Sequence, residues 1–449
     1  MFTISIVLVL VTILHSTFEI KKAIKQSRLG LFHYVIAWYI FIYGFAPLNM
    51  YVNSDCLSLP FRNYWINLIH DWGWVMFFYL TTYVALYLGY KLTKPTPKSI
   101  TLKPSAIQYN SQFNLSLLIL GVGIASLLWS IKGYGGTSYY VDNISAIRSG
   151  TDDNKNYLYA FIRMFSGYIL YAFILLYALS YSVNAKLIKG RLVLSFVVCC
   201  AFLSFYLLTS GGRASMITVF ILVLILIIQQ TGKIPYKAIF IFSIPVLFIV
   251  FYGKSYITTL FSDNQVSLQD LASSREISYW EAFMQEFCHQ TMNQVTALQN
   301  GLGSRLWKDY FIWILKPVRL WSSDTFYDSI SYYTTYQVLG KWESNIPPGF
   351  ISLALYNGGI LTLLIQSIGV GGILRKLDSL FLNSRLRSNP LIMCVYLVLF
   401  DLAWFALQNG DPALIIQASI PFLVLVIYLF TFGKARISDQ RVLHQSYFK

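Results

Sequence analysis

The sequence Thr209-Ser-Gly-Gly-Arg-Ala-Ser215 is a short polar break between two apolar runs, 192–208 and 216–228. Each run is roughly the length that a helix needs to cross a bilayer core. Because so short a break cannot fold as a domain, it predicts the tip of a helical hairpin, with Arg213 at its lip. An arginine held at that depth has a partner or a function. The stretch therefore predicts a chain that crosses the membrane and a candidate anion-binding residue.

The composition extends this prediction to the whole chain. It is 56% hydrophobic and 12% charged, with a mean hydropathy of +0.57. This excludes a soluble globular domain and indicates an all-α polytopic membrane protein. We predict about eleven spans, at 2–20, 31–50, 72–91, 113–131, 158–182, 192–209, 213–229, 237–253, 348–373, 390–408 and 412–432.

Lysine and arginine counts predict the orientation of these spans. The loops of one set, with the tail, hold 21 of the 34 basic residues, whereas the opposite loops hold 15 of the 19 acids. The basic set is therefore expected to be cytoplasmic, which places the N-terminus outside and the C-terminus inside. The net charge of +15 is then mostly a collar that faces anionic lipid headgroups, and we expect no nucleic-acid partner. The first span reads as a retained helix and not as a signal peptide.

Three regions follow: 1–253 with eight helices and an outer loop at 132–157, a large outer loop at 254–347, and 348–449 with three helices and a tail. A loop as long as 254–347 is usually functional. Within it, apolar residues recur at helical spacing over 275–300, and Gly301 is expected to end that helix. A second, aromatic-rich stretch covers 306–321, and Pro348 is placed to begin the ninth span.

Nucleotide and metal motifs are absent from the sequence: it has no Walker loop, dinucleotide fingerprint, HExxH, GxSxG or CxxC pair. We therefore expect no cofactor and no metal, and an enzyme on the outer face would need a substrate that is already activated on a lipid. Cys56 and Cys288 both fall on the outer side and could pair if they are close in space.

Outer arginines are the candidate ligands for the diphosphate of such a substrate. Guanidinium binds phosphate bidentately and stays charged at any working pH. Arg213 ranks first because no acid is near it in sequence and its flanking glycines clear space for a ligand. Arg319, Arg275 and Arg148 follow. The alternative for each is an ion pair with one of the outer acids or a contact with headgroups.

A base would be needed if a sugar hydroxyl is to attack an anomeric carbon. The candidates are His289, which is the only histidine of the large loop, and the outer acids, among them Asp324. Each has a structural alternative: His289 could be packed on its helix, and Asp324 could pair with Arg319. The sequence does not decide which of them is the base.

Three segments resemble the Wzy-type O-antigen polymerases, which are bacterial oligosaccharide repeat unit polymerases. They are Leu207-Leu-Thr-Ser-Gly-Gly-Arg-Ala-Ser-Met216, Asn345-Ile-Pro-Pro-Gly-Phe-Ile-Ser-Leu-Ala-Leu-Tyr-Asn-Gly-Gly359 and the segment Pro-Val-Arg-Leu-Trp at 317–321. Chain length, span count and the single large periplasmic loop are similar along essentially the whole chain.

The resemblance implies a GT-C-like glycosyltransferase of the bacterial inner membrane. It would join an undecaprenyl-diphosphate-linked glycan to another lipid-linked repeat unit and release undecaprenyl diphosphate. Arg213 and Arg319 match the arginines of that family and would hold the diphosphate, and Arg275 is a weaker match. A chain-length regulator protein is an implied partner.

Two alternatives stay open at this stage. An O-antigen ligase of the same superfamily would use the same donor, although such ligases usually carry a histidine late in the large loop and His289 is in its first half. A flippase for lipid-linked oligosaccharides would need charged residues along several spans, and these spans are nearly free of charge.

Overall fold

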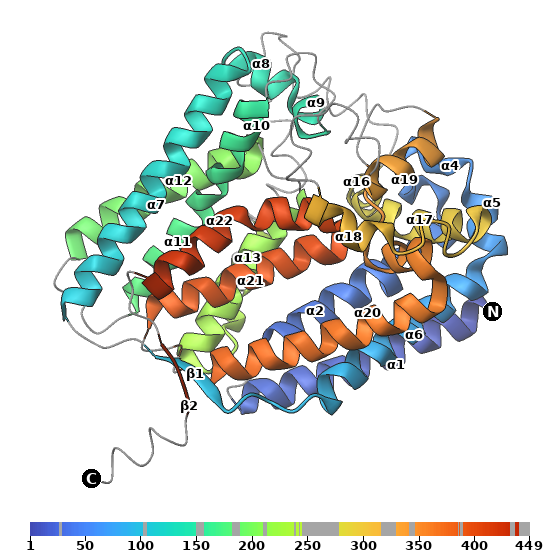
Figure 1. The fold of residues 1–449 in the computed structure, drawn as a ribbon, viewed down its shortest axis with the longest axis horizontal. Coiled ribbons are helices and arrows are strands. Elements are labelled where there is room, and N and C mark those ends of the chain that lie inside the picture. The colour runs from blue at the N-terminus through green and yellow to red at the C-terminus, as the bar shows by residue number, and fades with distance from the viewer. Residues whose placement is uncertain are drawn as a thin grey trace. The chain divides into compact units, whose positions relative to one another are not determined.

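The computed structural model describes residues 1–26, 29–101, 106–149, 157–181, 189–209, 213–237, 239–241, 243–244, 278–315, 329–340, 346–384, 386, 389–431 and 436–439. Within them, nine helical segments are long and apolar enough to cross a membrane (Figure 1). They are α1 (Phe2–Lys25), Leu31–Val52, α6 (Trp72–Leu92), α7 (Ala106–Gly133), Leu158–Ser180, α12 (Lys189–Thr209), α20 (Phe350–Leu382), α21 (Pro390–Asn409) and α22 (Pro412–Thr431).

These segments match nine of the eleven expected spans, so the predicted class of all-α polytopic membrane protein is confirmed. The expected seventh span is a helix, α13 (Arg213–Thr231), whose apolar part is shorter than the other nine. The expected eighth span, 237–253, falls mostly outside the described residues. Two short strands, which the sequence did not predict, pair in antiparallel register. They are β1 (Lys98–Thr101) and β2 (Arg436–Asp439), with Ile100 opposite Ile437.

The chain forms two compact units that are each assembled from separate stretches of sequence. Unit 1 comprises Met1–Thr96, Ile277–Asp378 and Leu402–Ser419, and unit 2 comprises Pro97–Glu276, Ser379–Asp401 and Ile420–Lys449.

Unit 1 is built on α1, the helical run Leu31–Val52, α6 and α20. Phe2 stacks on Tyr51 at a centroid distance of 4.5 Å, and the Trp72 indole donates to the Ser5 hydroxyl at 2.9 Å. At the other end of the same helices, the Lys91 ammonium lies 3.0 Å from the Glu19 carboxylate. Therefore α1 and α6 run in the same direction and Leu31–Val52 runs against them, as the predicted order of spans requires.

The two ends of this bundle differ in charge. The end at Tyr51 and Trp72, called the acidic end below, also holds Asp55, Asp71 and Glu281. The opposite end, called the basic end, holds Lys91 and Arg375 together with the last-turn lysines of α1.

Glycines let α6 and α20 approach at backbone distance. A Cβ added to Gly89 of α6 would lie 2.2 Å from the Ile368 carbonyl oxygen, and one added to Gly371 of α20 would lie 2.2 Å from the Leu86 carbonyl oxygen. Helix pairs in membranes associate through such small residues, because apolar side chains gain little by leaving lipid for a neighbouring helix.

Asp378 fixes the start of α2 (Leu31–Ile40) at the basic end. Its carboxylate accepts from the Leu31 and Phe32 backbone N–H groups at 2.6 and 3.2 Å, and from the Tyr90 hydroxyl at 3.1 Å. A carboxylate at a helix N-terminus satisfies free donors and complements the helix dipole. This one residue therefore ties α2, α6 and α20 together.

Short helices from the large loop cover the acidic end (Figure 1). They are α16 (Tyr279–Met284), α17 (Cys288–Asn300), α18 (Lys308–Leu315) and α19 (Ile330–Leu339), which lie beside α4 (Leu59–Arg62) and α5 (Trp65–His70). Ser278 and Glu281 form a capping box at the start of α16, in which each side chain accepts from the backbone N–H of the other. The helix expected at 275–300 is confirmed over 279–300 apart from a 3-10 turn at Gln285–Phe287, and Gly301 ends it with φ 93°.

Unit 2 contains the packed helices α7, α11 (Tyr168–Ser180) and α12, followed by α13. The segment between α7 and α11 forms the short helices α8 (Thr137–Asp142), α9 (Ile144–Ser149) and α10 (Tyr157–Met164). Gly123 of α7 allows a close approach, since a Cβ there would lie 2.8 Å from the Ile169 nitrogen of α11.

Candidate functional site

The helix α17 is buried nearly all round, although eight of its thirteen residues are polar. Among its buried side chains are Gln290, Thr291, Asn293 and Gln294, all with 0% exposure. The loop helices and the acidic end of the bundle enclose the polar face of the helix as well as its apolar face.

The amide nitrogens of the three buried amides of this helix each donate to a backbone carbonyl. Gln290 donates to the Gln408 carbonyl at 3.3 Å, Asn293 to the Pro347 carbonyl at 2.9 Å, and Gln294 to the Gln290 carbonyl at 3.4 Å. A carbonyl can only accept, so the nitrogen of each amide must face it and the amide orientation is fixed.

The amide oxygens therefore point elsewhere, and none of the three has a hydrogen-bond donor. The Thr291 hydroxyl oxygen, beside them on the same helix, is also without a partner. A buried polar atom left in this state costs about 1–3 kcal/mol, and in native proteins such atoms usually meet a water or a ligand. We call these four side chains the acceptor row of α17: Gln290, Thr291, Asn293 and Gln294.

His289, the expected proton acceptor, precedes the acceptor row on the same helix. The residue as a whole is partly exposed, but its Nε2 atom is buried and has no hydrogen-bond partner. Burial lowers the pKa of His289 to about 4, although the backbone of Gln408 opposes the shift. The imidazole is therefore neutral at pH 7 and can accept a proton, but burial also makes it a weak base. A negative charge placed beside it would raise its pKa toward the range useful for proton transfer.

The helix α20 is broken at Gly358 and Gly359, beside the loop that follows α17. Gly359 has φ 66°, a conformation that favours glycine, and the break frees carbonyls that would otherwise accept from the next turn. Backbone N–H groups of the loop after α17 take their place: Gly303 donates to Leu355, Arg305 to Tyr356 and Trp307 to Asn357, each at 2.8 Å.

A buried ion pair fastens this loop to the broken helix. The Arg305 guanidinium contacts both oxygens of Asp309 at 2.6 and 2.9 Å, with side chains 10% and 1% exposed. The Asn357 amide donates to Asp309 at 2.9 Å and accepts from its backbone N–H at 3.1 Å. Arg305 also lies over the Tyr333 ring at 5.0 Å. The guanidinium of Arg305 is thus engaged by Asp309 and Tyr333. This is the ion pair with an outer acid that the sequence offered as the alternative role of an outer arginine.

The entry into α20 is equally constrained. The Gly349 N–H donates to the Asn409 carbonyl at 2.9 Å, and the Phe350 N–H donates to the Tyr43 hydroxyl at 2.6 Å. A Cβ on Gly410 would lie 2.1 Å from the Gly349 carbonyl oxygen. Asp411 then caps α22 through the Ala413 N–H at 2.9 Å and accepts from the Ser331 hydroxyl of α19 at 2.6 Å.

Only one of the six side chains expected in the site is described by the structure, and that is His289 in unit 1. Arg213 is the first residue of α13 and Arg148 lies in α9, both in unit 2, but their side chains are outside the description. Arg275, Arg319 and Asp324 lie outside the described residues altogether.

The sequence contained signals for two features that the expectations missed. Gln290, Asn293 and Gln294 are spaced i, i+3 and i+4, which places three amides on one helical face. Asn357-Gly-Gly359 inside an apolar run is a helix-breaking pair next to a polar side chain. Both patterns indicate polar structure at the acidic end, where the large loop meets the membrane helices.

Cys56 and Cys288 are both buried at this end, and both are free thiols. The Cys288 sulfur lies 3.4 Å from the Ser58 hydroxyl. Burial raises the pKa of Cys56 to about 11, so its thiol is protonated and unreactive at neutral pH. The structure therefore holds the two residues as packed thiols and not as the disulfide that the sequence left open.

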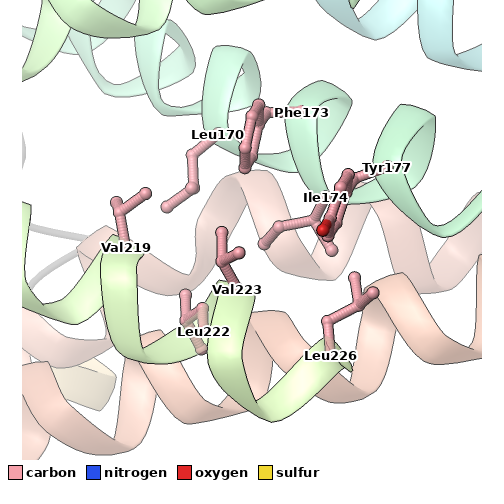
Figure 2. A pocket seen from close by; sticks show the side chains of 8 residues that line it. All are labelled: Leu170, Phe173, Ile174, Tyr177, Val219, Leu222, Val223 and Leu226. Atoms are coloured by element: carbon pink, nitrogen blue, oxygen red, sulfur yellow. The ribbon is translucent and has the colours of Figure 1, made fainter. Parts of the chain in front are cut away.

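Unit 2 contains an apolar hollow between α11 and α13 (Figure 2). It is too narrow to hold a water molecule, and its lining offers a single polar atom, the hydroxyl of Tyr177. Its lining side chains are Leu170, Phe173, Ile174, Tyr177, Val219, Leu222, Val223 and Leu226. It is a gap in helix packing and supplies no chemistry.

A comparison of the chain with protein-family models, with curated proteins and with solved structures found no match.

Proposed function

We propose that this protein is a membrane glycosyltransferase that polymerises oligosaccharide repeat units carried on undecaprenyl diphosphate. The reaction would take place on the periplasmic face of the bacterial inner membrane. The observation that carries the proposal is the position of Arg213. It is the first residue of α13, directly after the break that follows Thr209 at the end of α12.

The chemistry of that position suits a diphosphate. The first N–H groups of a helix have no partner within the helix and, with the helix dipole, attract anions. A guanidinium at the first helical residue adds a charge that can bind two phosphate oxygens at once. As the glycosidic bond to the donor forms and the old anomeric bond to phosphate breaks, the leaving diphosphate gains negative charge. A cation at this point would stabilise it.

The acceptor sugar would need a group that takes the proton from its attacking hydroxyl. His289 is neutral at pH 7 and its buried Nε2 has no hydrogen-bond partner, which suits a proton acceptor. Arg319, Arg275 and Arg148 stay as proposed further contacts to the diphosphate, and Asp324 stays as the alternative base. A chain-length regulator protein is the proposed partner.

A flippase for lipid-linked oligosaccharides is the second candidate, because α20 is discontinuous and transporters place substrate at broken helices. In those proteins the break lies near the middle of the membrane. Between Gly359 and Arg375, α20 has 15 uncharged residues, which extend roughly 22 Å at about 1.5 Å per residue and do not cross a whole bilayer core by themselves. The enzyme is favoured because the predicted spans are nearly free of charged residues, which a path for a charged lipid-linked substrate would need.

Deletion of the gene in its source strain separates these functions on a gel of surface polysaccharide. Loss of a polymerase leaves a core that carries one repeat unit, whereas loss of a ligase or a flippase leaves bare core. A ladder of normal length in the deletion strain would contradict all three. Complementation with the wild-type gene is the control and should restore the ladder.

A further inference from the structure

We propose that the acceptor row of α17 is a subsite for the hydroxyl groups of the glycan. This inference rests on the proposed function, because it assigns a different part of the same substrate. It concerns Gln290, Thr291, Asn293 and Gln294. None of these four was an expected site residue, although their neighbour His289 was.

The polarity of the row decides which part of the substrate it fits. Its four unpartnered atoms are the oxygens of three amides and one hydroxyl, and each amide has already used its nitrogen on a backbone carbonyl. Amide oxygens accept hydrogen bonds and cannot donate them. A diphosphate is also an acceptor, so the row would repel it. Sugar hydroxyls donate, and several of them stand on one ring.

The placement of the row agrees with this assignment. With about 100° per residue, Asn293, Gln290, Gln294 and Thr291 follow one another around a single side of the helix. His289 stands at one edge of that side with a free Nε2. A glycan on the row would therefore bring its hydroxyl groups next to the proposed proton acceptor.

Two of the four side chains can be changed without removing a strong hydrogen bond. Thr291 makes no side-chain hydrogen bond through its oxygen, and valine has the same shape. Gln294 donates only to the Gln290 carbonyl of its own helix at 3.4 Å, and methionine has nearly the same length. We therefore choose Thr291→Val and Gln294→Met. Each removes an unsatisfied oxygen, so the ligand-free protein should unfold at the same temperature as wild type or a higher one.

Matched controls lie on the same helix. Thr296→Val removes a hydroxyl that already donates to the Met292 carbonyl at 2.6 Å, and Gln299→Met changes an exposed glutamine. Neither removes an oxygen of the acceptor row. Both controls should therefore bind substrate as wild type does.

The experiment is thermal unfolding of the purified full-length protein in detergent with three added probes. The first is the oligosaccharide repeat released by acid from the strain's own surface polysaccharide, the second is undecaprenyl diphosphate, and the third is sodium chloride compared with choline chloride. We expect the released repeat to raise the unfolding temperature of wild type and both controls. In Thr291→Val and Gln294→Met, its half-saturating concentration should rise about fivefold to tenfold, the equivalent of one hydrogen bond. The response to undecaprenyl diphosphate should stay unchanged.

The subsite is overturned if both variants respond to the released repeat as wild type does, which would mean that the row holds only water. It is equally overturned if sodium alone stabilises the protein, which would make the row a cation site. These outcomes are separate from the gel of the deletion strain. If the deletion strain shows core with a single repeat and the two variants bind the released repeat as wild type does, the polymerase is supported and the subsite is contradicted. If the deletion strain shows bare core and the variants bind the repeat more weakly, the subsite is supported and the polymerase is contradicted.

Discussion

The Asp309 carboxylate accepts two hydrogen bonds from the Arg305 guanidinium, at 2.6 and 2.9 Å, in a position where Asp309 is only 1% exposed. The same carboxylate accepts from the Asn357 amide, one residue before the break in α20. Through this pair, the loop that follows α17 is held against the carbonyls that the break exposes. Arg305 therefore serves the fold, and the proposed contacts to a diphosphate rest on other arginines.

Replacement of Asp309 by asparagine should destabilise the protein strongly. The change leaves the Arg305 charge buried without its counter-ion, which typically costs about 3–5 kcal/mol. Thermal unfolding in detergent should show a clear drop in midpoint. Glu19→Gln is the matched control: its partner Lys91 is 42% exposed, and exposed pairs contribute about 0–1 kcal/mol. Equal effects of the two substitutions would contradict the role given to the buried pair.

The contact between α6 and α20 predicts different effects for two glycines of the same helix. Gly371→Ala should destabilise by about 1–3 kcal/mol, because its Cβ would meet the Leu86 carbonyl oxygen at 2.2 Å and the helices would have to separate. Gly369→Ala meets nothing within 4 Å and should be neutral, or stabilising by about 0.5–1 kcal/mol. The midpoints of thermal unfolding test both. A stable Gly371→Ala variant would show that the two helices do not touch there.

The buried imidazole of His289 predicts a dependence of stability on pH. Its pKa is about 4 in the folded protein against 6.5 when unfolded, so between these values the unfolded chain binds the extra proton. Stability should therefore fall as pH drops from about 6.5 to about 4, by at most about 3 kcal/mol. His289→Gln should flatten this part of the profile of unfolding temperature against pH. An unchanged slope in the variant would assign the pH dependence to other groups.

Replacement of Arg213 should slow catalysis and leave the stability of the fold nearly unchanged. Arg213→Ala should lower the polymerisation rate by about 10²–10³, the usual effect of removing one group that stabilises developing charge. Arg213→Lys should recover part of the rate, since lysine keeps the charge but not the bidentate geometry. Rates with purified lipid-linked repeats, set beside unfolding midpoints, separate this role from a structural one. A rate close to wild type in Arg213→Ala would contradict it.

The sequence was sufficient for the features that depend on local pattern. The length of apolar runs gave nine spans that the structure matches, and Gly301 and the break after Thr209 were identified as helix ends because glycine and polar residues interrupt those runs. The alternating direction of α1, Leu31–Val52 and α6 followed from span order alone.

Features that depend on contacts between distant residues were not predictable in this way. The burial of Gln290 and Asn293 depends on Pro347 and Gln408, which are far from them in sequence and contact them only in the folded chain. The same holds for Asp378, a charged residue in a cytoplasmic-type stretch whose role is to cap a helix more than 340 positions earlier, at Leu31.

The most direct test of the central claim is polymerisation by the purified protein in detergent or vesicles, with undecaprenyl-diphosphate-linked repeat units from the deletion strain as the only substrate. We predict a ladder of lipid-linked oligomers and release of undecaprenyl diphosphate, both without added nucleotide or metal and both slowed about 10²–10³-fold by Arg213→Ala. A preparation that is folded by its unfolding profile, yet leaves the repeat units unjoined, would contradict it.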